Sequence, residues 1–152
     1  MTTPLQENNP LETDLEAIER VMLQLGWATH RRLHQELAEF NLTVSQFAAM
    51  RALQEFDEGC SMSELAEAAR QISATMTGIV DRLVEREIIT RQRDPDDRRA
   101  LRVSLTERGT GLLETIKEKK RVRLARFLED LSPTERKDFV RMIGKYLEVV
   151  YG

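Results

Sequence analysis

The chain has 152 residues, of which 41% are apolar and 32% charged, with seven glycines, four prolines and one cysteine. This length corresponds to one domain, and the composition excludes collagen-like, low-complexity and wholly disordered chains. The net charge is −3, and no apolar run approaches the ~18 residues of a membrane span. We therefore expect a cytoplasmic protein with no membrane partner.

Charge is unevenly distributed along the chain. Residues 1–69 carry 4 basic and 12 acidic residues, whereas residues 70–102 carry 8 arginines and 6 acidic residues. A positive excess of this size is common on solvated surfaces. Charge alone therefore leaves open whether the middle of the chain attracts an anionic partner.

The N-terminal part predicts an arm followed by a long helix. Residues 1–10 are polar and aperiodic, which is typical of a flexible arm. Thr13 and Glu16 have the spacing of a capping box, and apolar residues then recur at three- and four-residue spacing. We predict a helix over residues 11–40.

Three shorter helices are predicted next. Thr43 and Gln46 form a second capping box, and Ser61 or Ser63 would begin a third helix. A tight connection over residues 70–72 leads to Ser73, which would cap a fourth helix. The buried stripe of that helix would comprise Met76, Ile79, Val80 and Leu83.

The pattern then changes from helix to strand. Residues 88–93 and 101–105 are typical of strands, and the proline- and aspartate-rich segment 94–100 between them predicts a hairpin turn. Thr106 would cap a fifth helix, and Ser132, Pro133 and Glu135 are a strong start signal for a sixth. The predicted fold is therefore mostly α with a small β-hairpin, as a single domain over residues 11–152.

Residues 43–105 have the element order of a winged helix-turn-helix, a unit that fits double-stranded DNA. An α-helix fits the major groove, and an arginine on an extended loop fits the narrower minor groove. The fourth helix would be the reader, although its polar face could equally be a solvated surface and Ser73 only a structural cap. The expected DNA contacts on this helix are Ser73, Ala74, Thr75, Thr77, Gly78 and Arg82.

The hairpin tip provides the sharper signal. Arg98 and Arg99 follow Asp97 between the two predicted strands. An isolated basic pair is usually ordinary surface, but this pair follows a helix-turn-helix pattern. We expect Asp97, Arg98 and Arg99 to contact DNA, with the carboxylate of Asp97 holding the guanidinium of Arg99.

These motifs together resemble the MarR (multiple antibiotic resistance regulator) family of transcription factors. The resemblance rests on the run Ile72–Arg86, on Asp94-Pro-Asp-Asp-Arg-Arg-Ala100 and on Val103-Ser-Leu-Thr106 followed by Gly109. It implies a homodimer in which the first, fifth and sixth helices pair, with Arg99 in the minor groove. Two residues depart from the family pattern: Gly78 replaces a larger, often basic residue, and Glu87 replaces a glycine.

The terminal segments independently suggest a dimer. Residues 11–40 and 107–152 carry more apolar residues than a slim winged domain can cover, unless the two segments pack on each other within one chain. Twofold symmetry would present two reader helices to a pseudo-palindromic operator. The expected interface residues are Leu11, Leu15, Ile18, Phe139, Ile143, Leu147 and Val150.

The resemblance also implies a small-molecule effector, such as an aromatic compound or a carboxylate, bound between the first, second and fifth helices. The expected lining is Trp27, His30, Arg31, Met50 and Ile116, although Trp27 could simply belong to the core. His30 and His34 are spaced to share a metal, and Cys60 is a lone thiol. A metal- or redox-responsive regulator therefore remains an alternative, but we expect no metal and no cofactor.

Enzymatic signatures are missing from the sequence: it has no phosphate loop, no dinucleotide-binding glycine pattern and no nucleophile elbow. The favoured hypothesis is a dimeric, sequence-specific DNA-binding regulator, a repressor of adjacent genes released by an effector. The alternative from a different class is a helical protein-interaction module that does not bind DNA. Such a module would have no use for Asp97 and Arg99.

Overall fold

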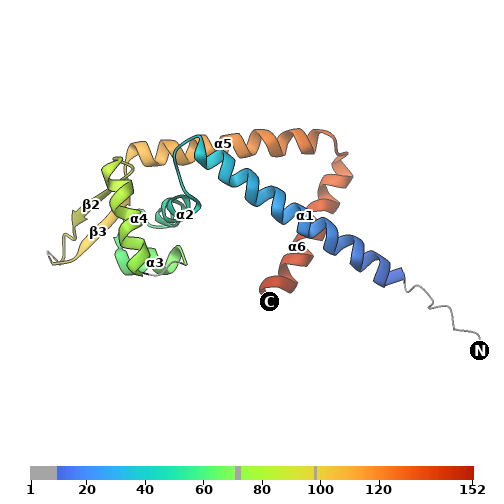
Figure 1. Ribbon diagram of the computed structural model, residues 1–152, viewed down its shortest axis with the longest axis horizontal. Coiled ribbons are helices and arrows are strands. Elements are labelled where there is room, and N and C mark those ends of the chain that lie inside the picture. The colour runs from blue at the N-terminus through green and yellow to red at the C-terminus, as the bar shows by residue number, and fades with distance from the viewer. Residues whose placement is uncertain (1–9, 71–72, 98) are drawn as a thin grey trace, which may run out of the picture.

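The computed structural model describes residues 10–70, 73–97 and 99–152, and within these ranges the chain forms six helices and three short strands (Figure 1). This confirms the predicted mostly helical fold with a hairpin. Of the arm expected over residues 1–10, residues 1–9 lie outside the described residues and Pro10 is helical; residues 71–72 of the expected connection and Arg98 also lie outside them. The elements in chain order are α1 (Pro10–Ala38), α2 (Val44–Leu53), β1 (Cys60–Ser61), α3 (Met62–Ala68), α4 (Ser73–Glu85), β2 (Ile89–Arg93), β3 (Leu101–Leu105), α5 (Glu107–Glu129) and α6 (Pro133–Tyr151).

Most helix starts follow the polar residues that the sequence singles out. Capping boxes form at Thr43, at Ser61 and at Ser132, and the hydroxyl of Thr106 accepts a hydrogen bond from the backbone N–H of Gly109. The capping box predicted at Thr13 is wrong. Helix α1 already begins at Pro10, because proline is well suited to a first helical turn, and Thr13 lies inside the helix.

The strands form one antiparallel sheet in the order β1-β3-β2. Strands β2 and β3 pair over five residues, from Ile89 opposite Leu105 to Arg93 opposite Leu101, and so form the predicted wing. Strand β1 was not predicted, because two residues are too few to show alternation. Gly59 before β1 has φ +77°, and a Cβ there would lie 2.5 Å from the carbonyl oxygen of Val103, so the turn requires glycine.

The core is centred on the winged unit, residues 43–105, and also includes side chains from the adjoining parts of α1 and α5. Leu37, Met50, Leu65, Leu83 and Ile116 are among its fully buried side chains. All four residues of the predicted stripe on α4 are buried. This packing fixes which face of α4 points outward, because the opposite face of an amphipathic helix must then meet solvent or a partner.

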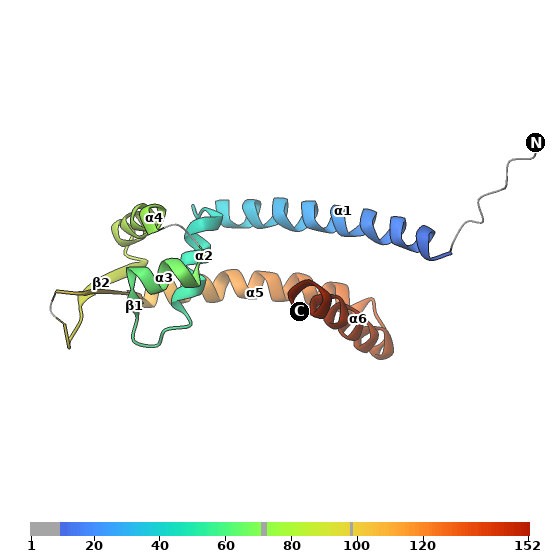
Figure 2. The same ribbon diagram turned by 90° about the horizontal axis from the view of Figure 1, so that it is seen from below.

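Helix α1 extends away from the winged unit, α6 turns back beyond the far end of α5, and both bury little of their own surface (Figure 1). Only Glu36 and Leu37 of α1 are buried, and no residue of α6 is. The two helices cross in Figure 1, but Figure 2 shows α1 on one side of α5 and α6 towards the other. A single chain therefore leaves both helices largely uncovered. In the described ranges no helix has the length and apolar character needed to cross a membrane.

Ion pairs attach the C-terminal end of α1 to α5. The carboxylate of Glu36, which is 4% exposed, pairs with Arg32 on its own helix and with Arg123 of α5. Glu39 pairs with Lys119 of α5. These ion pairs fix the C-terminal end of α1 to the middle of α5.

Candidate DNA interface

The outward face of α4 carries the residues expected to read DNA. Ala74, Thr75, Thr77, Gly78 and Arg82 are all exposed. A Cβ added at Gly78 would meet no atom within 4 Å, so the glycine leaves open space on this face rather than satisfying a packing constraint. Ser73 is the first helical residue rather than the preceding cap, and its side chain lies outside the described residues.

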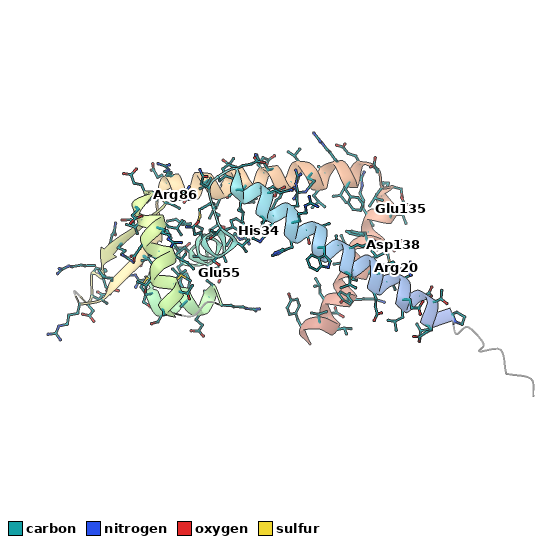
Figure 3. All side chains as sticks on the ribbon, viewed as in Figure 1. Arg20, His34, Glu55, Arg86, Glu135 and Asp138 are labelled. Atoms are coloured by element: carbon teal, nitrogen blue, oxygen red, sulfur yellow. The ribbon has the colours of Figure 1, made fainter. Side chains whose placement is uncertain are left out.

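Two arginines fix α4 relative to its neighbours. Arg91 of β2 forms an ion pair with Asp81 of α4 at 2.5 Å, which joins α4 to the wing. Arg86, in the turn that follows α4, donates to the main-chain carbonyls of Phe40 at 2.8 Å and Asn41 at 2.6 Å, just beyond α1 (Figure 3). The roles of Arg86 and Arg91 were not predicted from the sequence, because their partners are distant in sequence or belong to the main chain.

The turn between α4 and β2 is held in an unusual conformation. Glu87 has φ +57°, in the left-handed region, and the hydroxyl of Thr106 donates to its carbonyl at 2.6 Å. This is the position where the resemblance leads one to expect glycine. Gly109 packs so closely on the carbonyl of Ile88 that a Cβ would overlap with it, which explains the glycine of the Leu-Thr-x-x-Gly motif.

Replacing Glu87 with glycine is expected to raise the free energy of unfolding by about 1 kcal/mol, because a non-glycine residue in the left-handed region costs about 1–2 kcal/mol and glycine gives up part of this gain in unfolded-state entropy. Thermal unfolding measures the effect as a rise in Tm of about 2–4 °C. The exposed pair with Arg108, at 3.8 Å, contributes little.

The matched control for this substitution is Asn41→Gly. Asn41 has φ +52°, but asparagine tolerates this region better than glutamate. Its replacement should therefore raise Tm less. A Glu87→Gly protein with an unchanged or lower Tm would contradict the strain that we assign to this turn.

Hydrogen bonds between residues two or three positions apart order the wing turn. One carboxylate oxygen of Asp94 accepts from the N–H groups of Asp96 at 2.8 Å and Asp97 at 3.1 Å, and the carboxylate of Asp97 accepts from the N–H of Arg99 at 3.0 Å. These main-chain donors and the guanidinium of Arg102 lower the pKa of Asp94. The side chain of Arg99 is exposed, so the described turn presents it outward.

The structure gives Asp97 a different role from the expected one. Asp97 binds the main chain of Arg99, not its guanidinium. The guanidinium–carboxylate pair of the wing joins Arg102 to Asp94 at 3.1 Å. The physical reason is that an aspartate within a tight turn is closest to the N–H groups of the next few residues.

The five residues expected to line an effector pocket do not surround one hollow in the single chain. Met50 and Ile116 are buried in the core, with 0% and 1% exposure, whereas Trp27 is 75% exposed. Trp27 and His30 line an open hollow on α1 alone, and Arg31 is exposed. The separation arises because only the C-terminal end of α1 packs on the winged unit, and Trp27 lies nearer the N-terminus of the helix, beyond that contact. The alternative that Trp27 belongs to the core does not hold in the single chain.

A different hollow, of about 230 Å³, lies between α2 and α5. Among the described residues that line it, none is acidic. Burial lowers the pKa of Lys120, and the nearby Arg51 lowers it further. The amine of Lys120 lies 4.8 Å from the centre of the Phe47 ring. The lining combines four cations with apolar side chains: Phe47, Arg51, Gln54, Leu113, Ile116, Lys117, Lys120, Arg121 and Leu124.

The candidate metal and redox residues can also be placed. The Nε2 atoms of His30 and His34 lie 3.1 Å apart on the surface of α1, and among the described residues no three metal-ligating side chains gather. Cys60 is fully buried in β1, and burial raises the pKa of its thiol to about 11. The thiol is therefore protonated at neutral pH, which disfavours reactivity.

Comparison with known proteins identifies the family to which this architecture belongs. The model of the MarR family matches residues 42–101, which span the helix-turn-helix and most of the wing. The transcriptional repressor NicR of Pseudomonas putida is 36% identical over 119 residues, covering 76% of this chain and 73% of that protein. The chain belongs to the MarR family. As a MarR family member it is a transcriptional regulator and not an enzyme, as the sequence predicts.

Solved structures extend the similarity over nearly the whole MarR chain. A MarR family protein from Bacillus stearothermophilus is 26% identical with a TM-score of 0.79, covering 93% of this chain and 98% of that one. YusO from Bacillus subtilis has a TM-score of 0.81 at 21% identity over 92% of this chain and 99% of its own. A point mutant of MepR from S. aureus, bound to an oligodeoxyribonucleotide, has a TM-score of 0.69 at 18% identity over 88% and 97%. The last two show the shared fold.

Proposed function

We propose that this MarR family member is a homodimer that binds a pseudo-palindromic DNA operator and represses adjacent genes. The main supporting observation is that one chain exposes both a reader face on α4 and an ordered wing turn. The terminal helices meanwhile leave apolar side chains uncovered, which favours association with a second copy. The interface residues that are exposed in the single chain are Leu11, Leu15, Ile18, Phe139, Leu147 and Val150; Ile143 is half-buried.

Each part of the proposed interface has a distinct task. Thr75, Thr77 and Arg82 contact base edges or phosphates in the major groove, and Arg99 enters the minor groove. Ala74 and Gly78 allow close approach of the helix, while Ser73 and Arg98 complete the candidate contacts on the reader and the wing. Phosphate contacts supply salt-dependent affinity, and base contacts supply the sequence preference.

Selection from a random 30-base-pair duplex library tests this proposal. The expected outcome is enrichment of duplexes with two inverted half-sites about one helical turn apart, bound with strong salt dependence. Sedimentation of the complex should give two chains per duplex. Failure to enrich any sequence at low ionic strength, by folded and dimeric protein, would overturn the proposal and favour the interaction-module alternative.

We further propose that a small aromatic carboxylate releases the protein from DNA by binding in the hollow between α2 and α5. Four cations with no acid among the described lining residues favour an anion, and the apolar floor of Phe47, Leu113 and Leu124 favours an aromatic ring. Of the lining first expected from the sequence, only Ile116 borders this hollow. A ligand that prefers one arrangement of α2 and α5 would shift the spacing of the two reader helices.

A thermal-shift screen provides the measurement. At a concentration of about 100 times Kd, benzoate, salicylate or phenylacetate should stabilise the protein by about 2.7 kcal/mol, whereas the neutral amides of these acids should not. Arg51→Gln should weaken the acid's effect about tenfold in Kd, and the control Arg93→Gln, on the wing, should leave it unchanged. Equal shifts by acids and amides, or an unaffected Arg51→Gln protein, would contradict the assignment.

A further inference from the structure

Arg102 occupies a junction between the wing and the body of the helix-turn-helix. It lies on β3, opposite Ser61 of β1 on one side and Gln92 of β2 on the other. One guanidinium nitrogen donates to the carboxylate of Asp94 at 3.1 Å, at the start of the wing turn. The other donates to the carbonyl of Gly59 at 2.6 Å, just before β1.

The two acceptors belong to parts of the chain that need such a tie. Asp94 orders the wing turn, because its second carboxylate oxygen accepts from the N–H groups of Asp96 and Asp97. Gly59 is fixed to the body, because its N–H donates to the carbonyl of Phe56. It also lies so close to Val103 of β3 that its position tolerates no side chain. Only two residues of β1 pair with β3. Strand pairing alone therefore gives the wing little anchorage to the body.

The charge of Arg102 is already compensated within the protein. Its guanidinium pairs with Asp94 and also interacts electrostatically with the carboxylates of Glu64 and Glu58. Its side chain is 35% exposed and that of Asp94 is 16% exposed. A DNA phosphate would have to compete with these acids, so Arg102 is poorly suited to contact the backbone directly.

We propose that Arg102 is a positioning residue for DNA recognition, which joins Asp94 to the carbonyl of Gly59 and thereby sets the direction in which the wing presents Arg99. This inference rests on the proposed function of the wing. Loss of the tie would leave the base of the wing held by the Arg91–Asp81 pair, but the turn that carries Arg99 would be less restrained. Insertion of Arg99 into the groove would then require a larger loss of conformational entropy, which weakens binding.

The test compares Arg102→Ala with the control Arg93→Ala, another arginine of the same hairpin, on the duplex that the wild-type protein selects. We expect Arg102→Ala to weaken binding five- to tenfold without changing the slope of log K against log salt concentration. In an Arg99→Ala background the same substitution should weaken binding less than twofold, because Arg102 acts through Arg99. Arg102→Lys, which can reach only one of the two acceptors at a time, should bind with intermediate affinity even if Arg102→Ala folds poorly.

Three results would overturn the inference. Unchanged affinity would remove any role in recognition. A salt slope reduced by about one would indicate a direct phosphate contact. Equal weakening in the wild-type and Arg99→Ala backgrounds would indicate a general structural effect.

A measurement without DNA separates this inference from the proposed function. Amide hydrogen exchange over residues 94–101 should accelerate in Arg102→Ala and remain unchanged in Arg93→Ala, while exchange in the core helices stays the same. If the wild-type protein selects no duplex, the proposed function fails, and the exchange data alone decide whether Arg102 orders the wing. Unaltered exchange would overturn that statement as well.

Discussion

Replacing Leu147 with glutamate is expected to convert the proposed dimer into monomers and to weaken binding to the selected duplex about 100-fold, or about 2.7 kcal/mol. Leu147 lies on α6 and is 44% exposed in the single chain, so its replacement leaves the core intact. In the proposed dimer the same position is covered by apolar side chains, where an unpaired carboxylate is strongly unfavourable. A monomer would also engage only one half-site at a time.

Sedimentation velocity and gel-shift titration on the same preparations provide the measurements. Lys137→Glu, on the same helix, introduces the same carboxylate at an exposed position and should remain a dimer. Ile143→Glu should behave as Leu147→Glu does, although Ile143 is half-buried and the substitution also costs some stability. An intact dimer in the Leu147→Glu protein would remove α6 from the interface.

The second large effect is expected at the wing. Replacing Arg99 with alanine should weaken binding to the selected duplex at least tenfold, about 1.4 kcal/mol. The reason is that Arg99 is exposed on a turn whose main chain is ordered by Asp94 and Asp97, so little further ordering is required on binding. The narrow minor groove has an enhanced negative potential that favours an inserted guanidinium.

Lys145→Ala serves as the control for Arg99→Ala, because it removes one exposed cation from α6, far from the wing. It should change affinity less than twofold at physiological salt. Arg99→Lys keeps the charge but loses the planar guanidinium, and is expected to recover only part of the affinity. Wild-type affinity in Arg99→Ala would exclude the wing from recognition.

Local signals predicted most of the fold correctly. The capping residues at Thr43, Thr106 and Ser132 begin helices, since a side chain and a main-chain N–H three residues apart suffice to form the motif. The apolar stripe on α4 identified the outward face of this helix, because residues three and four positions apart lie on the same side of a helix. Strand β1 escaped notice because its two residues form a strand only by pairing with β3, more than forty positions later.

The candidate site was less predictable where it depends on distant parts of the chain. Proximity in sequence suggested that Asp97 holds the guanidinium of Arg99, but Asp97 binds the main-chain N–H of Arg99. The carboxylate–guanidinium pair instead spans the hairpin, from Asp94 to Arg102. Likewise, the sequence could not show that Trp27 is separated from Met50 and Ile116. That separation depends on which part of α1 packs on the winged unit, and no local pattern contains this information.

Arg86 joins the reader helix to the end of α1 through two carbonyl oxygens of the main chain. Every amino acid supplies such an oxygen, so this joint depends on the side chains of residues 40 and 41 only through the left-handed backbone that Asn41 adopts. The sequence of the first helix can therefore vary during evolution while its hydrogen-bonded attachment to α4 is retained. A chimaera that takes this helix from another family member should keep the joint, provided that the backbone turn at its end is preserved.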